Sequence, residues 1–223
     1  DVRRMLMRMK AQTMAARALV YYACAQVDRA GLGDAAAKDR LEIMTPLAKA
    51  HATDLGNEIA SIGVQVHGGM GYIEETGAAR FFRDARITPI YEGTNGIQAA
   101  DLVGRKLSLS NGGAFASLIA DMKAEAQHPQ LVTLIEACDA VGRRLQTADA
   151  DDRLAASYPF LTMLSVASCG WLMEKMARAD AGNATRAALS GFYLDQIVPE
   201  ALGLRAAADA PAAPLYALEA DAF

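Results

Sequence analysis

A single carboxylate, Glu92, stands in the segment YEGTNGIQ at residues 91–98, directly before a glycine. The residues ahead of it, ITPIY at 87–91, are mostly apolar and include a proline. On such a turn a carboxyl group can reach a bound molecule, and desolvation in a dry pocket raises the pKa of a carboxyl group, which suits a general base. The alternative is a solvated surface glutamate, which composition alone favours. The segment therefore predicts a candidate base, weighed against a plain surface charge.

A second candidate is the glycine-rich segment GVQVHGGMGY at residues 63–72, which follows a helical pattern. Its clustered glycines permit positive φ and close approach of another group to the backbone. The alternative is a helix C-terminus with a tight turn, which the pattern alone favours. It is not a dinucleotide-binding GxGxxG motif, because no strand precedes it. Near the glutamate, Thr94 or Asn95 can cap the next helix and leave N–H groups that favour an anion.

Together these segments resemble the C-terminal domain of the acyl-CoA dehydrogenase family. The resemblance covers roughly residues 1–107, and its specific part runs from QVHGGMGY (65–72) through ARFFRDARITPIYEGTNGIQ (79–98). The order of a glycine loop, an FRDA segment and then I-Y-E-G-T carries it, and either half alone is weak. In such enzymes the glutamate of E-G-T is commonly the catalytic base, and the match puts that role at Glu92.

The resemblance implies a reaction. Glu92 removes the pro-R α-proton of an acyl-CoA thioester, the β-hydrogen leaves as hydride to N5 of FAD, and the product is a trans-2-enoyl-CoA. The backbone N–H of Glu92 and a ribityl hydroxyl of the flavin are implied to stabilise the enolate-like charge on the thioester carbonyl. The base and the flavin are expected to lie on opposite faces of the substrate, and water is expected to be excluded from the site.

The resemblance also implies roles for neighbouring residues. Tyr91 and Gly93 are expected to line the acyl thioester. The segment of the glycine turn is expected to touch the FAD of a neighbouring subunit, and the segment after the glutamate to meet FAD as well. His67 is more readily a packing residue than a proton donor. The expected FAD contacts are Gln65, Val66, His67, Gly68, Gly69, Thr94 and Asn95.

Composition limits the other possibilities. The chain has 223 residues, 52% hydrophobic and 22% charged, with a net charge of −4, which is typical of a soluble globular protein and gives no basic patch for nucleic acid. No spacing of Cys and His suggests a metal site, and no apolar run is long enough for a membrane span. A cytoplasmic location is expected. Expected to be reduced and buried are Cys24, Cys138 and Cys169; expected to be solvated are Arg80, Arg83, Asp84, Arg86, Arg105 and Lys106.

Apolar residues at helical spacing predict an all-α fold. A helical bundle is expected over residues 1–109, followed by a second helical unit over 114–223, with SNGGA at 110–114 as the boundary. Pro89 predicts an extended segment at 87–91. Helices are predicted over 2–30, 39–67, 78–86, from 94 onward, and over 114–126, 130–147, 158–180 and 184–207.

The second unit resembles, more weakly, the extra helical domain of longer bacterial acyl-CoA dehydrogenases, including the type that acts on 3-methylmercaptopropionyl-CoA. Structural support or oligomer contact is its expected role. Its apolar stretch at 158–176 is expected to pack inside rather than attach to a membrane. The family's other two domains and the first bundle helix are expected upstream of Asp1. The chain alone is therefore expected to expose an apolar groove, and neither to retain FAD nor to turn over acyl-CoA.

Two function classes remain open at this point. The first is the catalytic-base domain of an FAD-dependent acyl-CoA dehydrogenase, for which the resemblance implies an electron-transfer flavoprotein as partner and a homodimer or homotetramer. The second is a helical oligomerisation or assembly module that keeps the fold without catalysis. An oxidase that passes electrons to O2 is a third possibility, distinguished by release of peroxide.

Overall fold

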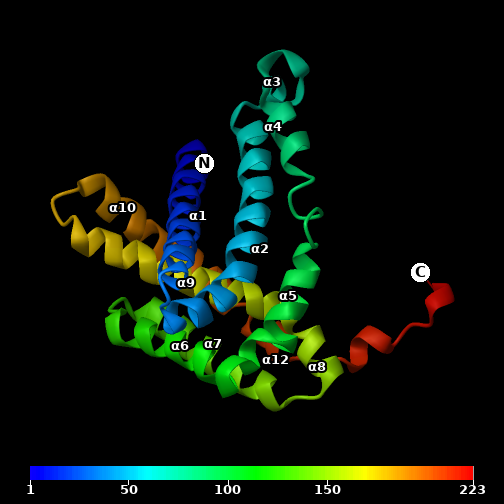
Figure 1. Ribbon diagram of the computed structural model, residues 1–223. Helices are drawn as coiled ribbons and strands as arrows, with labels where there is room; N and C mark the ends of the chain where they lie inside the picture. Colours follow the sequence, from blue (N-terminus) through cyan, green and yellow to red (C-terminus); the bar gives the residue numbers. More distant parts are fainter. Residues whose placement is uncertain (223) are drawn as a thin grey trace.

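Two long antiparallel helices, α1 (Val2–Gly31) and α2 (Ala35–Val66), begin the computed structural model, which describes residues 1–222 (Figure 1). The turn between them contains Gly33 at φ +94°, and Asp34 caps α2 by accepting a hydrogen bond from the Ala37 N–H. Within residues 1–222 every regular element is a helix, so the predicted all-α class is confirmed.

Shorter helices follow the end of α2 and return along it. They are α3 (Gly69–Tyr72), the 3-10 turn η1 (Glu74–Thr76), α4 (Ala78–Ala85) and α5 (Asn95–Gly104), with α4 and α5 both packed against α2 (Figure 1).

The segment 87–91 was expected to be extended, and this is wrong. The structure has consecutive tight turns, in which the N–H groups of Ile90 and Tyr91 both donate to the carbonyl of Ile87, at 3.0 and 3.2 Å. Pro89 ends the helix because it lacks an N–H group, but the residues around it still close turns. The chain therefore passes through tight turns here before it enters α5.

The second unit wraps around one central helix, α9 (Ser157–Ala179), which is buried along most of its length. Of the remaining elements, most pack on or near it, and those of the C-terminal tail extend away from the body (Figure 1). They are η2 (Lys106–Gly112), α6 (Gly113–Glu125), α7 (Pro129–Thr147), α8 (Ala150–Ala155), α10 (Ala184–Phe192), the π-helical η3 (Tyr193–Ile197), α11 (Val198–Leu202), α12 (Arg205–Asp209), η4 (Ala213–Tyr216) and η5 (Ala220–Ala222).

The single helix expected over 184–207 is broken into pieces. Pro199 stands in the first turn of α11, and the π-helical segment η3 directly precedes it. A proline inside a helix clashes with the carbonyl four residues back, and a π-helical turn moves that carbonyl away. The pattern of apolar residues did not show this interruption.

One hydrophobic core joins the two predicted units. It includes Leu19 and Leu47 of the long helices, Leu102 of α5, and Phe160 and Leu164 of α9, all with 0% exposed surface. No helix in residues 1–222 is long and apolar enough to cross a membrane. The division at 110–114 remains a prediction, and the core runs across it.

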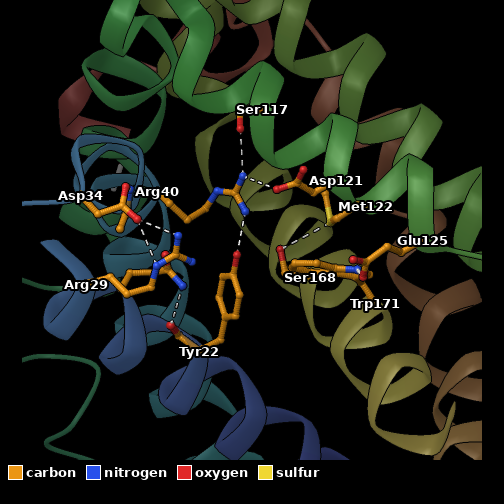
Figure 2. Close-up of polar contacts among 12 residues, drawn as sticks. Tyr22, Arg29, Asp34, Arg40, Ser117, Asp121, Met122, Glu125, Ser168 and Trp171 are labelled. Atoms are coloured by element: carbon orange, nitrogen blue, oxygen red, sulfur yellow. Dashed lines mark hydrogen bonds and ion pairs between the residues drawn. The ribbon is translucent and has the colours of Figure 1, made fainter. Parts of the chain in front are cut away.

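A buried guanidinium group ties three helices together (Figure 2). Arg40 of α2 is 7% exposed and donates to the hydroxyl of Tyr22 at 2.7 Å, to Ser117 Oγ at 3.0 Å and to Asp121 Oδ2 at 2.7 Å. Trp171 of α9 similarly donates its ring N–H to Glu125 of α6 at 2.7 Å. Such charge-assisted bonds fix α1 and α2 against α6 of the second unit.

The surface predictions were partly wrong. Lys106, expected to be solvated, is 5% exposed and pairs with Glu42 of α2. Cys24, expected to be buried, is exposed, whereas the other two cysteines are buried. Arg80 is solvated as expected, 3.5 Å from Asp84 across one helical turn.

The packing of the second unit can be tested with two glycines in helices. A Cβ atom at Gly142 of α7 would lie 2.3 Å from the ring of Phe115, which is itself buried. Gly142→Ala should therefore lower the free energy of unfolding by about 1–3 kcal/mol. At Gly191 of α10 the same space is open, so Gly191→Ala should raise it by about 0.5–1 kcal/mol. Urea unfolding of both variants measures this, and equal effects would contradict the packing.

Candidate functional site

Glu92 has a backbone conformation that is rare for its residue type. Its φ is +54°, in the left-handed region, and Gly93 after it has φ +81°. Within residues 1–222 only Ser110 and Asn111 are other non-glycine residues with positive φ. A left-handed conformation costs an L-residue about 1–2 kcal/mol, and such outliers cluster at functional sites. The side chain of Glu92 is exposed.

Hydrogen bonds close the loop on both sides of the glutamate. The N–H of Asn95 donates to the carbonyl of Pro89 at 3.0 Å, and the Tyr91 N–H donates to Ile87. Thr94 caps α5, as predicted, because its Oγ1 accepts from the Ile97 N–H at 3.2 Å. No hydrogen bond within residues 1–222 uses the N–H of Glu92 itself. That N–H is therefore available to a ligand.

Asn95 fastens the loop to α2. Its side chain is 3% exposed, and its Nδ2 lies 3.0 Å from the carbonyl of Ala50, 2.9 Å from Thr53 Oγ1 and 2.8 Å from Asp54 Oδ1. Its Oδ1 accepts from Lys49 Nζ at 2.8 Å. The amide of Asn95 is thus occupied within the chain, which leaves no side-chain N–H for the predicted contact with FAD.

The glycine turn lies at the other end of α2. His67 follows its last residue, and Gly68 has φ +60° and ψ −144°. A Cβ atom at Gly68 or Gly69 would meet nothing within 4 Å, whereas at Gly71 it would lie 2.2 Å from the carbonyl oxygen of Val64. The turn therefore packs on α2 through Gly71 and presents an open face at the two glycines before it.

His67 was expected to be a packing residue rather than a proton donor, and the structure places its side chain at the surface. Its side chain is exposed, and its Nδ1 lies 2.8 Å from the carbonyl oxygen of Gly63. The ring therefore completes the end of α2 instead of filling a core. Gln65 is also exposed, and Val66 is half-buried.

The structure does not bring the two predicted halves of the site together within one chain. Thr53, at the level of the Glu92 loop, and Gln65, at the glycine turn, are both on α2. At 1.5 Å per residue they are about 18 Å apart along the helix. A single small ligand cannot touch both places. An extended ligand, or ligands shared between two subunits, could do so.

The dry pocket expected around Glu92 is not made by residues 1–222. A hollow of about 530 Å³ lies beside the loop, lined among others by Arg86, Thr94 and Tyr158, and Glu92 is not part of its lining. Ile90 and Tyr91, each 48% exposed, present apolar surface next to the glutamate. Exclusion of water from Glu92 therefore requires further residues to cover this surface.

Apolar hollows line α2 between the two predicted halves of the site. One of about 490 Å³ lies between Met9 of α1, Ile59 of α2 and Phe81 of α4, and a second of about 410 Å³ includes Ile59 and Tyr21. The chain alone was expected to expose an apolar groove, and these hollows are exposed apolar surface of that kind. Within residues 1–222, no group of three or more metal-ligating side chains is gathered.

Sequence reasoning missed residues that position the loop. On α2, Lys49, Thr53 and Asn57 recur every four residues and form a polar stripe that faces the loop. That spacing is visible in the sequence and could have indicated it. Tyr158, whose hydroxyl donates to Asp54 at 2.6 Å, comes from a distant helix, and no local pattern indicates it.

Comparisons with known proteins agree with the fold. Residues 1–107 match the family described as acyl-CoA dehydrogenase, C-terminal domain, and residues 111–219 match acetyl-CoA dehydrogenase C-terminal like. The 3-methylmercaptopropionyl-CoA dehydrogenase of Ruegeria pomeroyi is 41% identical over 203 residues, which are 80% of this chain and 34% of that protein. The caffeyl-CoA reductase-Etf complex subunit CarC of Acetobacterium woodii is 36% identical over 103 residues, 46% of this chain and 25% of its own.

Solved structures show the same fold at lower identity. An acyl-CoA dehydrogenase complexed with FAD from Bacillus anthracis has a TM-score of 0.73 at 18% identity and covers 98% of this chain and 42% of its own. Caenorhabditis elegans ACDH-11 in complex with C11-CoA has a TM-score of 0.71 at 22% identity, and the match covers 87% of this chain and 36% of that protein. The chain thus spans about a third of the length of its 41%-identical relative. Because residues 1–107 match the acyl-CoA dehydrogenase C-terminal domain and residues 111–219 match the acetyl-CoA dehydrogenase C-terminal-like domain, the chain belongs to the acyl-CoA dehydrogenase family.

Proposed function

We propose that this chain is the C-terminal part of an FAD-dependent acyl-CoA dehydrogenase, which converts an acyl-CoA thioester to a trans-2-enoyl-CoA with Glu92 as the base. The observation that carries the proposal is the left-handed backbone of Glu92 in a loop closed by hydrogen bonds. A glutamate is a poor choice for that conformation on structural grounds alone. The advantage of a glutamate at this position is therefore its carboxylate.

The geometry of the loop suits removal of an α-proton. The two left-handed residues, Glu92 and Gly93, leave the carboxylate exposed and free of ion pairs within residues 1–222. A base must be free to accept a proton at the substrate carbon, and a carboxylate bound to an arginine would be less basic. The unused N–H of Glu92 is a donor of the kind that stabilises the charge on a thioester carbonyl.

FAD, when bound, supplies the hydride acceptor for the β-hydrogen. The residues of this chain proposed to hold it are the exposed turn at 65–69 and the capping residue Thr94. The open space at Gly68 and Gly69 allows a ligand to approach the backbone closely. Because the turn and the Glu92 loop are far apart on α2, we propose that the turn of one subunit serves the FAD of another. We do not expect the 223-residue chain by itself to retain FAD.

Partners follow from the same proposal. An acyl-CoA is the proposed substrate, and an electron-transfer flavoprotein is the proposed acceptor, as the Etf complex of one relative suggests. Assembly as a homodimer or homotetramer and a cytoplasmic location remain predictions. The alternative, an assembly module without catalysis, has no use for a strained glutamate, and the observation at Glu92 therefore favours the enzyme.

The base is tested by Glu92→Gln in the full-length polypeptide that carries this chain. Loss of a positioned general base should lower kcat about 10²–10⁴-fold, while the amide keeps the size of the side chain. The measurement is reduction of an electron acceptor with FAD and a panel of acyl-CoA thioesters. Glu75→Gln, an exposed glutamate in η1, is the matched control and should retain activity. A near-normal kcat in Glu92→Gln would show that Glu92 is not the base.

The strained backbone is tested separately from activity. Glu92→Gly should raise the free energy of unfolding of the 223-residue chain by about 0.5–1 kcal/mol, because glycine adopts positive φ without steric cost. Glu75→Gly, at an ordinary backbone position, should lower it by about 0.5–1 kcal/mol. Denaturant unfolding compares the two. A loss of stability in both variants would show that residue 92 is not held in the left-handed conformation.

The glycine turn offers a third test. Gly71→Ala should lower the free energy of unfolding by about 1–3 kcal/mol, because its Cβ would meet the Val64 carbonyl. Gly69→Ala should change stability by less than about 0.5 kcal/mol, since nothing lies near its Cβ. If the turn contacts FAD, Gly69→Ala should nevertheless reduce the FAD content of the purified full-length enzyme. Undiminished FAD in Gly69→Ala would place the cofactor elsewhere.

A further inference from the structure

A single carboxylate links the Glu92 loop to the second helical unit. Asp54 of α2 accepts a hydrogen bond from Asn95 Nδ2 on its Oδ1, at 2.8 Å, and from the Tyr158 hydroxyl on its Oδ2, at 2.6 Å. Tyr158 is the second residue of α9, the central helix of the second unit. A continuous chain of hydrogen bonds therefore runs from α9 through α2 to the first residue of α5.

In the series Tyr158, Asp54 and Asn95, the orientation of each side chain depends on the hydrogen bond made by its neighbour. A carboxylate can rotate about its last bond, and a donor on one oxygen fixes where the other oxygen points. With Tyr158 on Oδ2, the Oδ1 atom of Asp54 is directed at Asn95. Bonds to a charged acceptor are about twice as strong as neutral ones, and the 2.6 Å separation of the tyrosine bond is short.

Asn95 transmits this arrangement to the glutamate. It lies three residues after Glu92, is buried, and bonds through its backbone N–H to Pro89 on the other side of the loop. A shift of the Asn95 side chain would therefore move the base of the loop that holds Glu92 in its left-handed conformation. The other ties of the loop, from Lys49, Thr53 and Asn57, all come from α2 itself.

We propose that Tyr158 is a positioning residue for the Glu92 loop, so that the second helical unit helps to set the geometry of the base. The proposal deepens the proposed function and rests on it for its catalytic meaning. It gives residues 111–219 a role beyond support, because one side chain of that unit reaches the loop network through Asp54. Burial and the neighbouring carboxylate also raise the pKa of Tyr158 to about 12, so its hydroxyl remains a donor at neutral pH.

The experiment removes only the hydroxyl group. Tyr158→Phe keeps the ring, and hydrogen exchange of the 223-residue chain then reports how firmly the loop is held. Loss of a bond to a partly exposed carboxylate should speed exchange of the hydrogen-bonded amides within 91–98, those of Tyr91, Asn95, Ile97 and Gln98, by roughly 5-fold. Tyr22→Phe is the matched control, because Tyr22 loses a comparable bond, to Arg40, which lies about 21 Å from Asp54 along α2. It should destabilise the chain without selective change at 91–98.

Activity of the full-length enzyme provides the second measurement. Tyr158→Phe should lower kcat several-fold, because a less firmly held loop positions Glu92 less precisely, whereas Tyr22→Phe should retain kcat. Unchanged exchange at 91–98 in Tyr158→Phe would overturn the inference even if Glu92→Gln is inactive. Faster exchange with an active Glu92→Gln would instead confirm the link and overturn the proposed base. Equal losses of kcat in Tyr158→Phe and Tyr22→Phe would reduce Tyr158 to a general stabilising residue.

Discussion

The buried amide of Asn95 is the interaction on which the site depends. A side-chain amide has two donors and one acceptor oxygen, and inside a protein each must be bonded or the fold is destabilised. The groups around Asn95 satisfy both needs, with acceptors on α2 for its nitrogen and Lys49 for its oxygen. This fixes where α5 starts, and the start of α5 limits the paths open to the chain between residues 87 and 95. The unusual backbone of Glu92 is part of the path that the chain takes.

Local signals in the sequence were enough for most of the helices. Apolar spacing found the two long helices, the start of α5 and the buried α9, because those elements bury one stripe or their whole surface. It failed where tertiary contacts decide the backbone. Pro89 ends a helix in either case, and only the hydrogen bonds to Ile87 and from Asn95 select turns over an extended strand. Likewise, the π-helical segment before Pro199 relieves a clash that periodicity does not register.

The same distinction between local signals and tertiary contacts applies to the residues of the site. Residue type and local spacing predicted a cap at Thr94 or Asn95, and Thr94 provides it, whereas the roles of Glu92 and the glycine turn stay predictions. Burial of Asn95 and Lys106 was missed, since a polar residue becomes buried only when distant partners satisfy it. The sequence also did not show how far apart the turn and the Glu92 loop lie along α2, because the two segments are close in the chain and the straight helix separates them.

Glu92 differs from the other non-glycine residues of positive φ in what its side chain does within residues 1–222. Ser110 and Asn111 take the left-handed conformation at the junction of the two predicted units, where the chain must turn and where short polar side chains tolerate it. Glu92 has a longer side chain and makes no side-chain hydrogen bond or ion pair within residues 1–222 that would repay the strain. Structural need therefore explains the first pair and not the glutamate. The proposed function supplies a reason for it, because a base needs a carboxylate that is held in place and not already bonded. The second unit, by fixing Asp54 through Tyr158, makes that place less free to move.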